Sequence, residues 1–454
     1  MLDKLLHKLL GGSDHLKNSV PPFRGLKIYR KLKASHTRWT VRGQQAPSSC
    51  WHLPLPFDVL FAIVDAYFDD DAVTILSLRQ SCHSLAELCR PFLYRTLTIK
   101  SRSSDVVTAS ERLAALLSKS PDIVDHVRTL RVLDHGKMFE GSRPITPEEE
   151  YLCYILTRPY PQLKRLELSL HVVWTLLPSQ VQHAFEVAFS NVREIAFDNV
   201  RIPVNLFRFF TNLRVLEMRG EASIPLIADH GGSTVSTRKP YCFPEWILIK
   251  DDTRSGFIIN CLFHEQSALR FSNMKHLQLF ISGEHIKLLN GRLDMCSGTL
   301  TNLELYIGTW GSLPTVLGLE SLIALTSLTL TSDISMMPYG SLGTEGLHRF
   351  NWLVTTLASS ARPSRLESIK FIIRTRSFSF AKQLPWDNLD ALFSPVTEKR
   401  WPSLRKFDIL HIKESKGNME GSIEAMVLPM MPVLRQSEVL RFRVSSRWME
   451  FWRM

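Results

Sequence analysis

Residues 300–305 read Leu-Thr-Asn-Leu-Glu-Leu, and residues 325–330 read Leu-Thr-Ser-Leu-Thr-Leu. In both stretches the last three positions alternate apolar and polar side chains, which is typical of a short β-strand with one buried face. The same apolar-x-x-apolar-x-apolar pattern recurs from residue 127 onward. It begins at Val127, Leu163, Val192, Leu213, Met274, Leu300, Leu325, Leu366 and Leu404.

Stretches with helical spacing of apolar residues separate several of these strands. They cover residues 111–117, 179–189, 313–325 and 347–358. Alternating short strands and helices predict an α/β solenoid over residues 104–450, in which each repeat buries its strand against the helix behind it and against its neighbours. A non-solenoid α/β domain with several similar strands stays open as the alternative.

The pattern resembles the leucine-rich repeats that often follow an F-box in fungal proteins. Several starts are separated by about 20–29 residues, as in that family. The asparagine that usually closes the family's motif is missing, because its position holds residues such as His135, Glu221 and Ser282. We therefore expect the repeats to be irregular.

The long interval between Leu213 and Met274 predicts an irregular insertion near residues 221–260. Long loops in compact folds are usually functional or disordered. This one carries Tyr241, Phe243 and Trp246, and aromatic side chains dominate binding hot spots. These residues are candidate target-binding residues; alternatively, they cover an end of the core.

Residues 55–99 precede the repeats and begin with Leu55, Pro56 and Phe57. Apolar residues at three- and four-residue steps predict three short helices, the last with Leu85, Leu88, Cys89 and Phe92 facing inward. Pro56 suits the first turn of a helix. We expect a separate domain at residues 50–100. Three short helices cannot bury all of these apolar residues, so some must face a partner or the next domain.

This segment resembles the F-box, and particularly its fungal branch. The residues that carry the resemblance are Leu55, Pro56, Asp58, Val59, Leu60, Ile63, Leu76, Leu78 and Cys82. The resemblance implies that they bind the Skp-type adaptor of a cullin ubiquitin ligase. One departure is Leu85, where the family commonly has Trp. The alternative is an ordinary helical cap on a larger domain.

The net charge of +11 is concentrated at the amino terminus. Residues 1–45 carry ten Lys or Arg against two Asp, which leaves only +3 for the rest of the chain. We expect residues 1–49 to be a basic, disordered leader. The near-neutral body argues against a large nucleic-acid interface, whereas weak membrane contact by the leader stays open.

Seven scattered cysteines and the absence of an Asn-x-Ser/Thr sequon favour a reduced, intracellular protein. No apolar run is long enough for a transmembrane segment. We expect the protein in the cytoplasm, the nucleus or both.

The sequence holds no pattern typical of a catalytic centre. His264-Glu265 begins like a zinc-binding motif, but Ala268 stands where the second histidine would be. No phosphate-binding glycine loop or nucleophile elbow is present. We expect a protein that is not an enzyme and needs no cofactor or metal.

Together, the two resemblances imply a substrate-recognition adaptor of an SCF-type ubiquitin ligase. The F-box would bind the adaptor, and the repeat domain would hold an unknown protein target. Two alternatives stay open: a scaffold that binds the adaptor without directing ubiquitylation, and a nucleic-acid- or membrane-associated protein acting through its basic leader.

Overall fold

The computed structural model describes residues 57–67, 72–81, 83–100, 107–134, 145–220, 241–250, 258–259, 262–263, 267–307, 315–333, 344–359, 365–375, 378–394, 401–413 and 420–445. The expected leader at residues 1–49 lies outside these ranges, as do Leu55, Pro56 and Cys82. Most of the expected insertion, residues 221–240, 251–257 and 260, also lies outside them.

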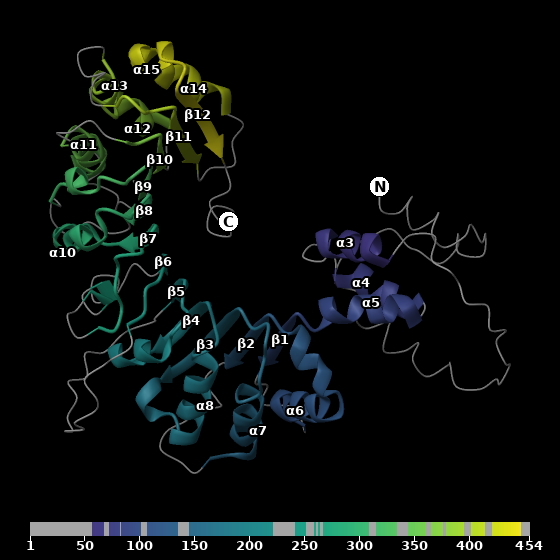
Figure 1. Cartoon of the computed structure of the whole chain (residues 1–454). Helices are drawn as coiled ribbons and strands as arrows, with labels where there is room; N and C mark the ends of the chain where they lie inside the picture. The colour runs from purple at the N-terminus through teal and green to yellow at the C-terminus, as the bar shows by residue number, and fades with distance from the viewer. Residues whose placement is uncertain are drawn as a thin grey trace, which may run out of the picture. The chain divides into compact units, whose positions relative to one another are not determined.

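The chain divides into two compact units, Met1–Leu93 and Tyr94–Met454. The described part of the first unit consists of helices α3 (Phe57–Tyr67), α4 (Ala72–Ser81) and α5 (His83–Leu93), labelled in Figure 1. They enclose a small core of their own, formed by Leu60, Val64, Ile75, Leu85, Leu88, Cys89 and Phe92. The expectation that four residues of the third helix face inward is confirmed, because the helical spacing places them on one side.

The second unit holds one parallel sheet whose described strands, β1 to β12, stand in chain order. Each of β2 to β11 pairs in parallel with the strands before and after it in the chain, and the end strands β1 and β12 pair with β2 and β11, which confirms the expected mixed α/β class. The strands are β1 (Thr96–Lys100), β2 (Thr129–Asp134), β3 (Arg165–Val173), β4 (Glu194–Arg201), β5 (Val215–Arg219), β6 (Trp246–Lys250), β7 (His276–Ile281), β8 (Asn302–Ile307), β9 (Ser327–Asp333), β10 (Ser368–Thr375), β11 (Lys406–Lys413) and β12 (Leu440–Ser445).

Helices connect the strands and lie along one side of the sheet (Figure 1). The α-helices are α6 (Ala109–Lys119), α7 (Pro147–Leu156), α8 (Ser179–Phe189), α10 (Ile286–Leu293), α11 (Thr344–Ala358), α12 (Phe378–Gln383), α13 (Trp386–Ala391), α14 (Glu420–Val427) and α15 (Pro432–Gln436). Short 3-10 helices replace or extend them. They are η2 (Pro121–His126), η3 (Trp174–Leu176), η4 (Val204–Phe209), η5 (Gly283–His285), η6 (Asp294–Cys296), η7 (Leu319–Ser321) and η9 (Leu428–Met430).

The apolar positions of the repeating pattern form the core between sheet and helices. Leu277, Leu303 and Leu328 stand side by side in β7, β8 and β9, and each is fully buried. Equivalent columns run through the other strands into one continuous core from Leu97 to Leu434. Burying a leucine side chain contributes about 1.5–3 kcal/mol, so the columns hold neighbouring strands and helices together.

Two strands break the sequence pattern and were not expected. In β6, Ile247 and Ile249 align with the apolar pair of β5, which places buried Pro244 at the first apolar position. In β12, alignment with β11 places the polar Ser437 at that position. The expected insertion at residues 221–260 therefore needs correction, because residues 246–250 form a strand of the sheet.

The helix expected at residues 313–325 is wrong. The described part, residues 315–325, contains only the 3-10 turn η7. Leu317, Leu322 and Leu325 are buried as their helical spacing suggested, but Gly318 departs from helical dihedrals at φ −78° and ψ 85°. The first unit also ends earlier than residue 100, because β1 pairs with β2 and belongs to the sheet.

Candidate partner-binding surface

The sheet has an open face, which we define as the face turned away from the helices. Successive strand residues point to opposite sides, so the residues between the buried apolar positions lie on this face. The alternation is clear in β6, where Ile247 and Ile249 are buried while Trp246 is 44% exposed. Open-face residues at paired positions of neighbouring strands stand side by side and form rows across the sheet.

One group of open-face residues is a salt-bridge network across β2 to β6, centred on Glu217. Its side chain is only 6% exposed. Its carboxylate accepts hydrogen bonds from Arg165 Nη2 at 2.8 Å and Arg219 Nε at 2.8 Å, and Lys250 Nζ lies 3.0 Å away. The other members of this Glu217 network are Arg131, Glu167 and Glu194.

The protonation state of the Glu217 network follows from these contacts. Burial alone would raise the pKa of Glu217, but hydrogen bonds from Lys250, Arg165 and Arg219 together lower it from its ordinary value of 4.5 to about 2. Burial of Arg165 acts to lower its pKa, and its hydrogen bonds to Glu167 and Glu217 raise it above its ordinary value. Both groups are therefore charged at neutral pH, and the network joins strands rather than exchanging protons.

A second group, on β6, β7 and β8, consists of two ring pairs, Trp246 with His276 and Phe280 with Tyr306, which together we call the aromatic cluster. The Trp246 and His276 rings stack with centroids 4.6 Å apart and planes 9° apart. The Phe280 and Tyr306 rings are tilted, with centroids 3.6 Å apart. Burial lowers the pKa of His276, although Glu304 opposes the shift from 3.8 Å away. The cluster is therefore largely uncharged at neutral pH and offers an exposed Trp beside polar strand residues.

The three expected target-binding residues have different neighbours, and their role in binding a target stays a prediction. Trp246 lies in the aromatic cluster, whereas Tyr241 and Phe243 precede β6 and flank buried Cys242, which bridges to Leu269. Tyr241 is 48% exposed and lies under the Arg270 guanidinium, 4.0 Å from its ring centroid. Phe243 is 43% exposed. In the described part of the chain, no ring contact joins either residue to Trp246.

The sequence analysis missed His276 as the stacking partner of Trp246, and it missed the pair of Phe280 and Tyr306. The sequence did contain a clue, because His276, Phe280 and Tyr306 are aromatic residues at positions of adjacent repeats between or beside the buried apolar ones. Recognising the Trp246–His276 pair requires knowing that residues 246–250 form a strand, and the repeating apolar pattern does not predict that strand. The register of β6 against β7 is what brings Trp246 beside His276.

The expected adaptor-binding residues that are described all lie on α3 and α4. Val59 is 41% exposed and Leu76 is 46% exposed, while Leu60 lies in the core of the first unit. Leu78 is partly buried against that core, and Asp58 is exposed in the first turn of α3. The backbone of Ile63 belongs to α3. Their contact with an adaptor stays a prediction.

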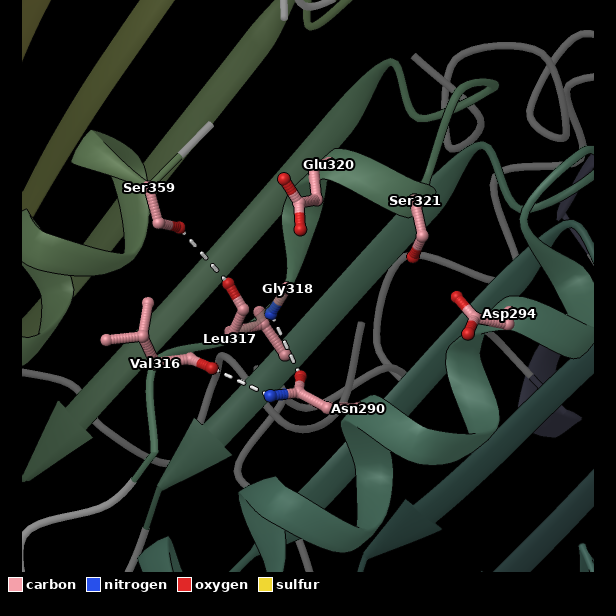
Figure 2. Close-up of a pocket in the computed structure, with 8 residues that line it drawn as sticks. All are labelled: Asn290, Asp294, Val316, Leu317, Gly318, Glu320, Ser321 and Ser359. Carbon is pink, nitrogen blue, oxygen red and sulfur yellow. Dashed lines mark hydrogen bonds between the residues drawn. The ribbon is translucent and has the colours of Figure 1, made fainter. Parts of the chain in front are cut away.

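A pocket of about 410 Å³ opens between α10 and the segment before β9 (Figure 2). Asn290 clamps that segment, because its Nδ2 donates to the Val316 carbonyl at 2.7 Å and its Oδ1 accepts from Gly318 N–H at 2.9 Å. Ser359 Oγ donates to the Leu317 carbonyl at 3.4 Å. These contacts satisfy backbone groups of the connecting segment, so the pocket wall is primarily a structural device.

The described ranges also bear on metal-ligand groups, reactive thiols and membrane-spanning helices. They contain no group of three or more His, Cys, Asp or Glu side chains placed to hold a metal ion. Burial raises the pKa of the Cys242 and Cys296 thiols to about 12, so neither is a thiolate at neutral pH. No helix among the described residues has the length and apolar character required to cross a bilayer.

No protein-family model matches this chain, and a search of curated proteins finds no match either.

Proposed function

We propose that this protein is a substrate-recognition adaptor of an SCF-type cullin ubiquitin ligase. In this proposal α3–α5 form an F-box that docks on the Skp-type adaptor. The sheet unit acts as an irregular leucine-rich-repeat domain and holds a protein target on its open face. The chain itself performs no chemistry; it raises the effective concentration of target lysines near a conjugating enzyme. The proposal implies a protein of the cytoplasm or nucleus.

The observation that carries the proposal is the exposure of aliphatic side chains on the small helical unit. Val59, Val73 and Leu76 are 41%, 63% and 46% exposed, although the unit has a packed core of its own. Val73 and Leu76 lie one turn apart on the same side of α4. Full burial of such a side chain contributes about 1.5–3 kcal/mol, so half-exposed ones contribute about half of that each. Their positions fall within the segment that resembles the F-box.

The open face supports the second half of the proposal. The aromatic cluster combines an exposed Trp with neighbouring polar side chains, which is the composition of binding hot spots. The Glu217 network beside it already pairs its charges internally. We therefore expect the aromatic cluster, rather than the network, to contribute most of the affinity for a target.

Co-purification with a Skp-type adaptor tests the function. We expect the wild-type chain to bind the adaptor in equimolar amounts, and Val59→Lys/Leu76→Lys to weaken binding by about a hundredfold or more, because a buried lysine loses its hydration. Both residues are exposed, so the variant keeps the fold.

The matched control is Leu176→Lys/Ile323→Lys, which places lysine at aliphatic positions of similar exposure, 49% and 60%, in the sheet unit. It should bind the adaptor like the wild type. No binding by a folded wild-type chain, or equal loss in both variants, would contradict the proposal. Adaptor binding without any associated ubiquitylated protein would point to the scaffold function instead.

A further inference from the structure

Five basic residues stand at equivalent positions immediately before the first five strands. They are Arg95, Arg128, Lys164, Arg193 and Arg214, which we call the cation column. Backbone hydrogen bonds hold them in line. The Arg128 carbonyl accepts from the N–H groups of Lys164 and Arg165 at 2.9 and 3.0 Å, and the carbonyls of Lys164 and Arg193 each accept from the next strand in the same way.

These backbone hydrogen bonds fix the spacing between the backbones of neighbouring residues of the cation column. Neighbouring strands are about 4.8 Å apart, so the column extends roughly 19 Å along the amino-terminal edge of the sheet. Lys164, Arg193 and Arg214 are exposed, and Arg128 is half-buried. Like charges at this separation repel one another.

Anions are scarce along this edge. Among the residues that the structure describes, Arg128, Lys164 and Arg193 form no ion pair. The segments leading into β3, β4 and β5, at residues 157–163, 190–192 and 211–213, contain no Asp or Glu. Among the described residues, the acids near the column are Glu245 beside Arg214, Glu194 directly after Arg193, and Asp122 and Asp125 in η2 before β2.

The column ends abruptly at β6. There the equivalent position is Glu245, which lies 3.8 Å from Arg214 and 3.0 Å from Lys275. From β7 onward the position holds Lys275, Thr301, Thr326, Glu367 and Arg405, a mixture with little net charge. The run of like charge is therefore confined to β1–β5.

We propose that the cation column binds an acidic, extended peptide segment of a partner protein. An extended chain advances about 3.3 Å per residue, so roughly six residues match the length of the column. Acidic side chains at alternate positions project from one side of such a segment, and the long Arg and Lys side chains can reach each of them. The column uses neither the aromatic cluster nor the exposed aliphatic residues of α3 and α4. This inference is therefore independent of the proposed function.

The neighbouring charges favour a narrow partner over a nucleic acid. Glu194 follows Arg193 directly, and Glu167 and Glu217 lie on the adjoining open face. A nucleic-acid duplex needs a broad basic surface and would bring its phosphates close to these carboxylates. A single extended peptide can follow the column and avoid them.

The test uses the full chain and a fluorescein-labelled peptide, Glu-Ser-Glu-Ser-Glu-Ser-Glu. We expect Arg128→Gln/Lys164→Gln/Arg193→Gln to weaken binding by about tenfold or more and to reduce its salt dependence, because three ionic contacts are lost. The control variant Lys287→Gln/Lys382→Gln/Arg435→Gln removes the same charge from exposed positions elsewhere and should bind within about twofold of the wild type.

Lysine protection measured residue by residue distinguishes peptide binding at the cation column from peptide binding at the basic leader. Lysine acetylation of the wild-type chain, followed by mass spectrometry, should show Lys164 protected by the peptide and Lys287 unaffected. A peptide with Gln in place of Glu should give no protection. Equal weakening of both variants, protection limited to leader lysines, absence of binding, or stronger protection of Lys164 by an oligothymidine of equal charge would overturn the proposal.

Discussion

At the scale of single residues, Glu217 shows how the open face is stabilised. Three cations from three strands converge on one nearly buried carboxylate. Replacing it with glutamine leaves these cations without their common counter-charge. We expect Glu217→Gln to lower the free energy of unfolding by about 2–3 kcal/mol at pH 7, less than for a fully buried ion pair because Arg219 is partly exposed.

The loss should depend on pH with a defined sign. Because the folded-state pKa of Glu217 is lowered from 4.5 to about 2, its ionisation stabilises the fold fully above pH 4.5, and this contribution disappears as the pH falls towards 2. The difference between wild type and variant should therefore shrink by about 1.4 kcal/mol between pH 7 and pH 3.5.

Urea unfolding at both pH values checks the Glu217 prediction. Glu194→Gln is the matched control, since Glu194 is 39% exposed and meets a single cation at 3.3 Å. It should cost less than about 1 kcal/mol at pH 7. A Glu217→Gln penalty that is small at pH 7, or that does not change with pH, would contradict this account.

At the scale of elements, Asn290 connects helix α10 to the segment that leads into β9. Its side-chain amide makes one donor and one acceptor contact with backbone at Val316 and Gly318 (Figure 2). We expect Asn290→Ala to destabilise the protein by about 1–3 kcal/mol and to speed amide exchange in residues 315–320, because it leaves both backbone groups without these partners. Asn388→Ala, at an exposed position of α13, is the control and should leave both quantities nearly unchanged. Unaltered exchange in residues 315–320 would show that the clamp is not needed.

A strand could be predicted from the sequence only where its segment matches the apolar-x-x-apolar-x-apolar pattern. The strands at Leu303 and Leu328 were predictable because all three apolar positions are occupied. The strands at Ile247 and Leu440 were not, because Pro244 and Ser437 fill the first position while the other two still pack in the core. Packing against the neighbouring strands stabilises these two strands without an apolar residue at the first position, and these contacts between repeats are not visible in the local sequence pattern.

The candidate surface was less predictable than the fold. Trp246 could be singled out as an aromatic residue in an unusual segment, but its stacking on His276 depends on strand register. The Glu217 network joins residues from β3, β5 and β6 that lie far apart in the chain. The assembled sheet determines which residues of neighbouring strands stand side by side. The spacing of apolar residues along the sequence predicts only which side of its own strand a residue occupies.

At the scale of the whole molecule, the two units have separate buried cores. The core of the first unit contains Leu88, which is fully buried, and shares no residue with the core of the sheet unit. A small helical unit of this size buries few apolar side chains, so its stability is marginal. We expect Leu88→Ala, which removes about 2–5 kcal/mol through lost burial and a cavity, to unfold or loosen the first unit alone.

Amide hydrogen exchange can locate that loss. In Leu88→Ala, exchange should accelerate in the described helices of residues 57–93 and stay unchanged in the strands. The fluorescence transition of the buried tryptophans of the sheet unit, Trp174, Trp352, Trp386 and Trp401, should not move. The matched variant Leu277→Ala makes an equivalent cavity in the sheet core and should do the reverse. If Leu88→Ala also accelerates exchange across the strands, then the two units fold as one cooperative body, and loss of adaptor binding in first-unit variants could not be assigned to a contact surface. Independent responses would instead allow adaptor docking and partner recognition to be studied by separate substitutions in one chain.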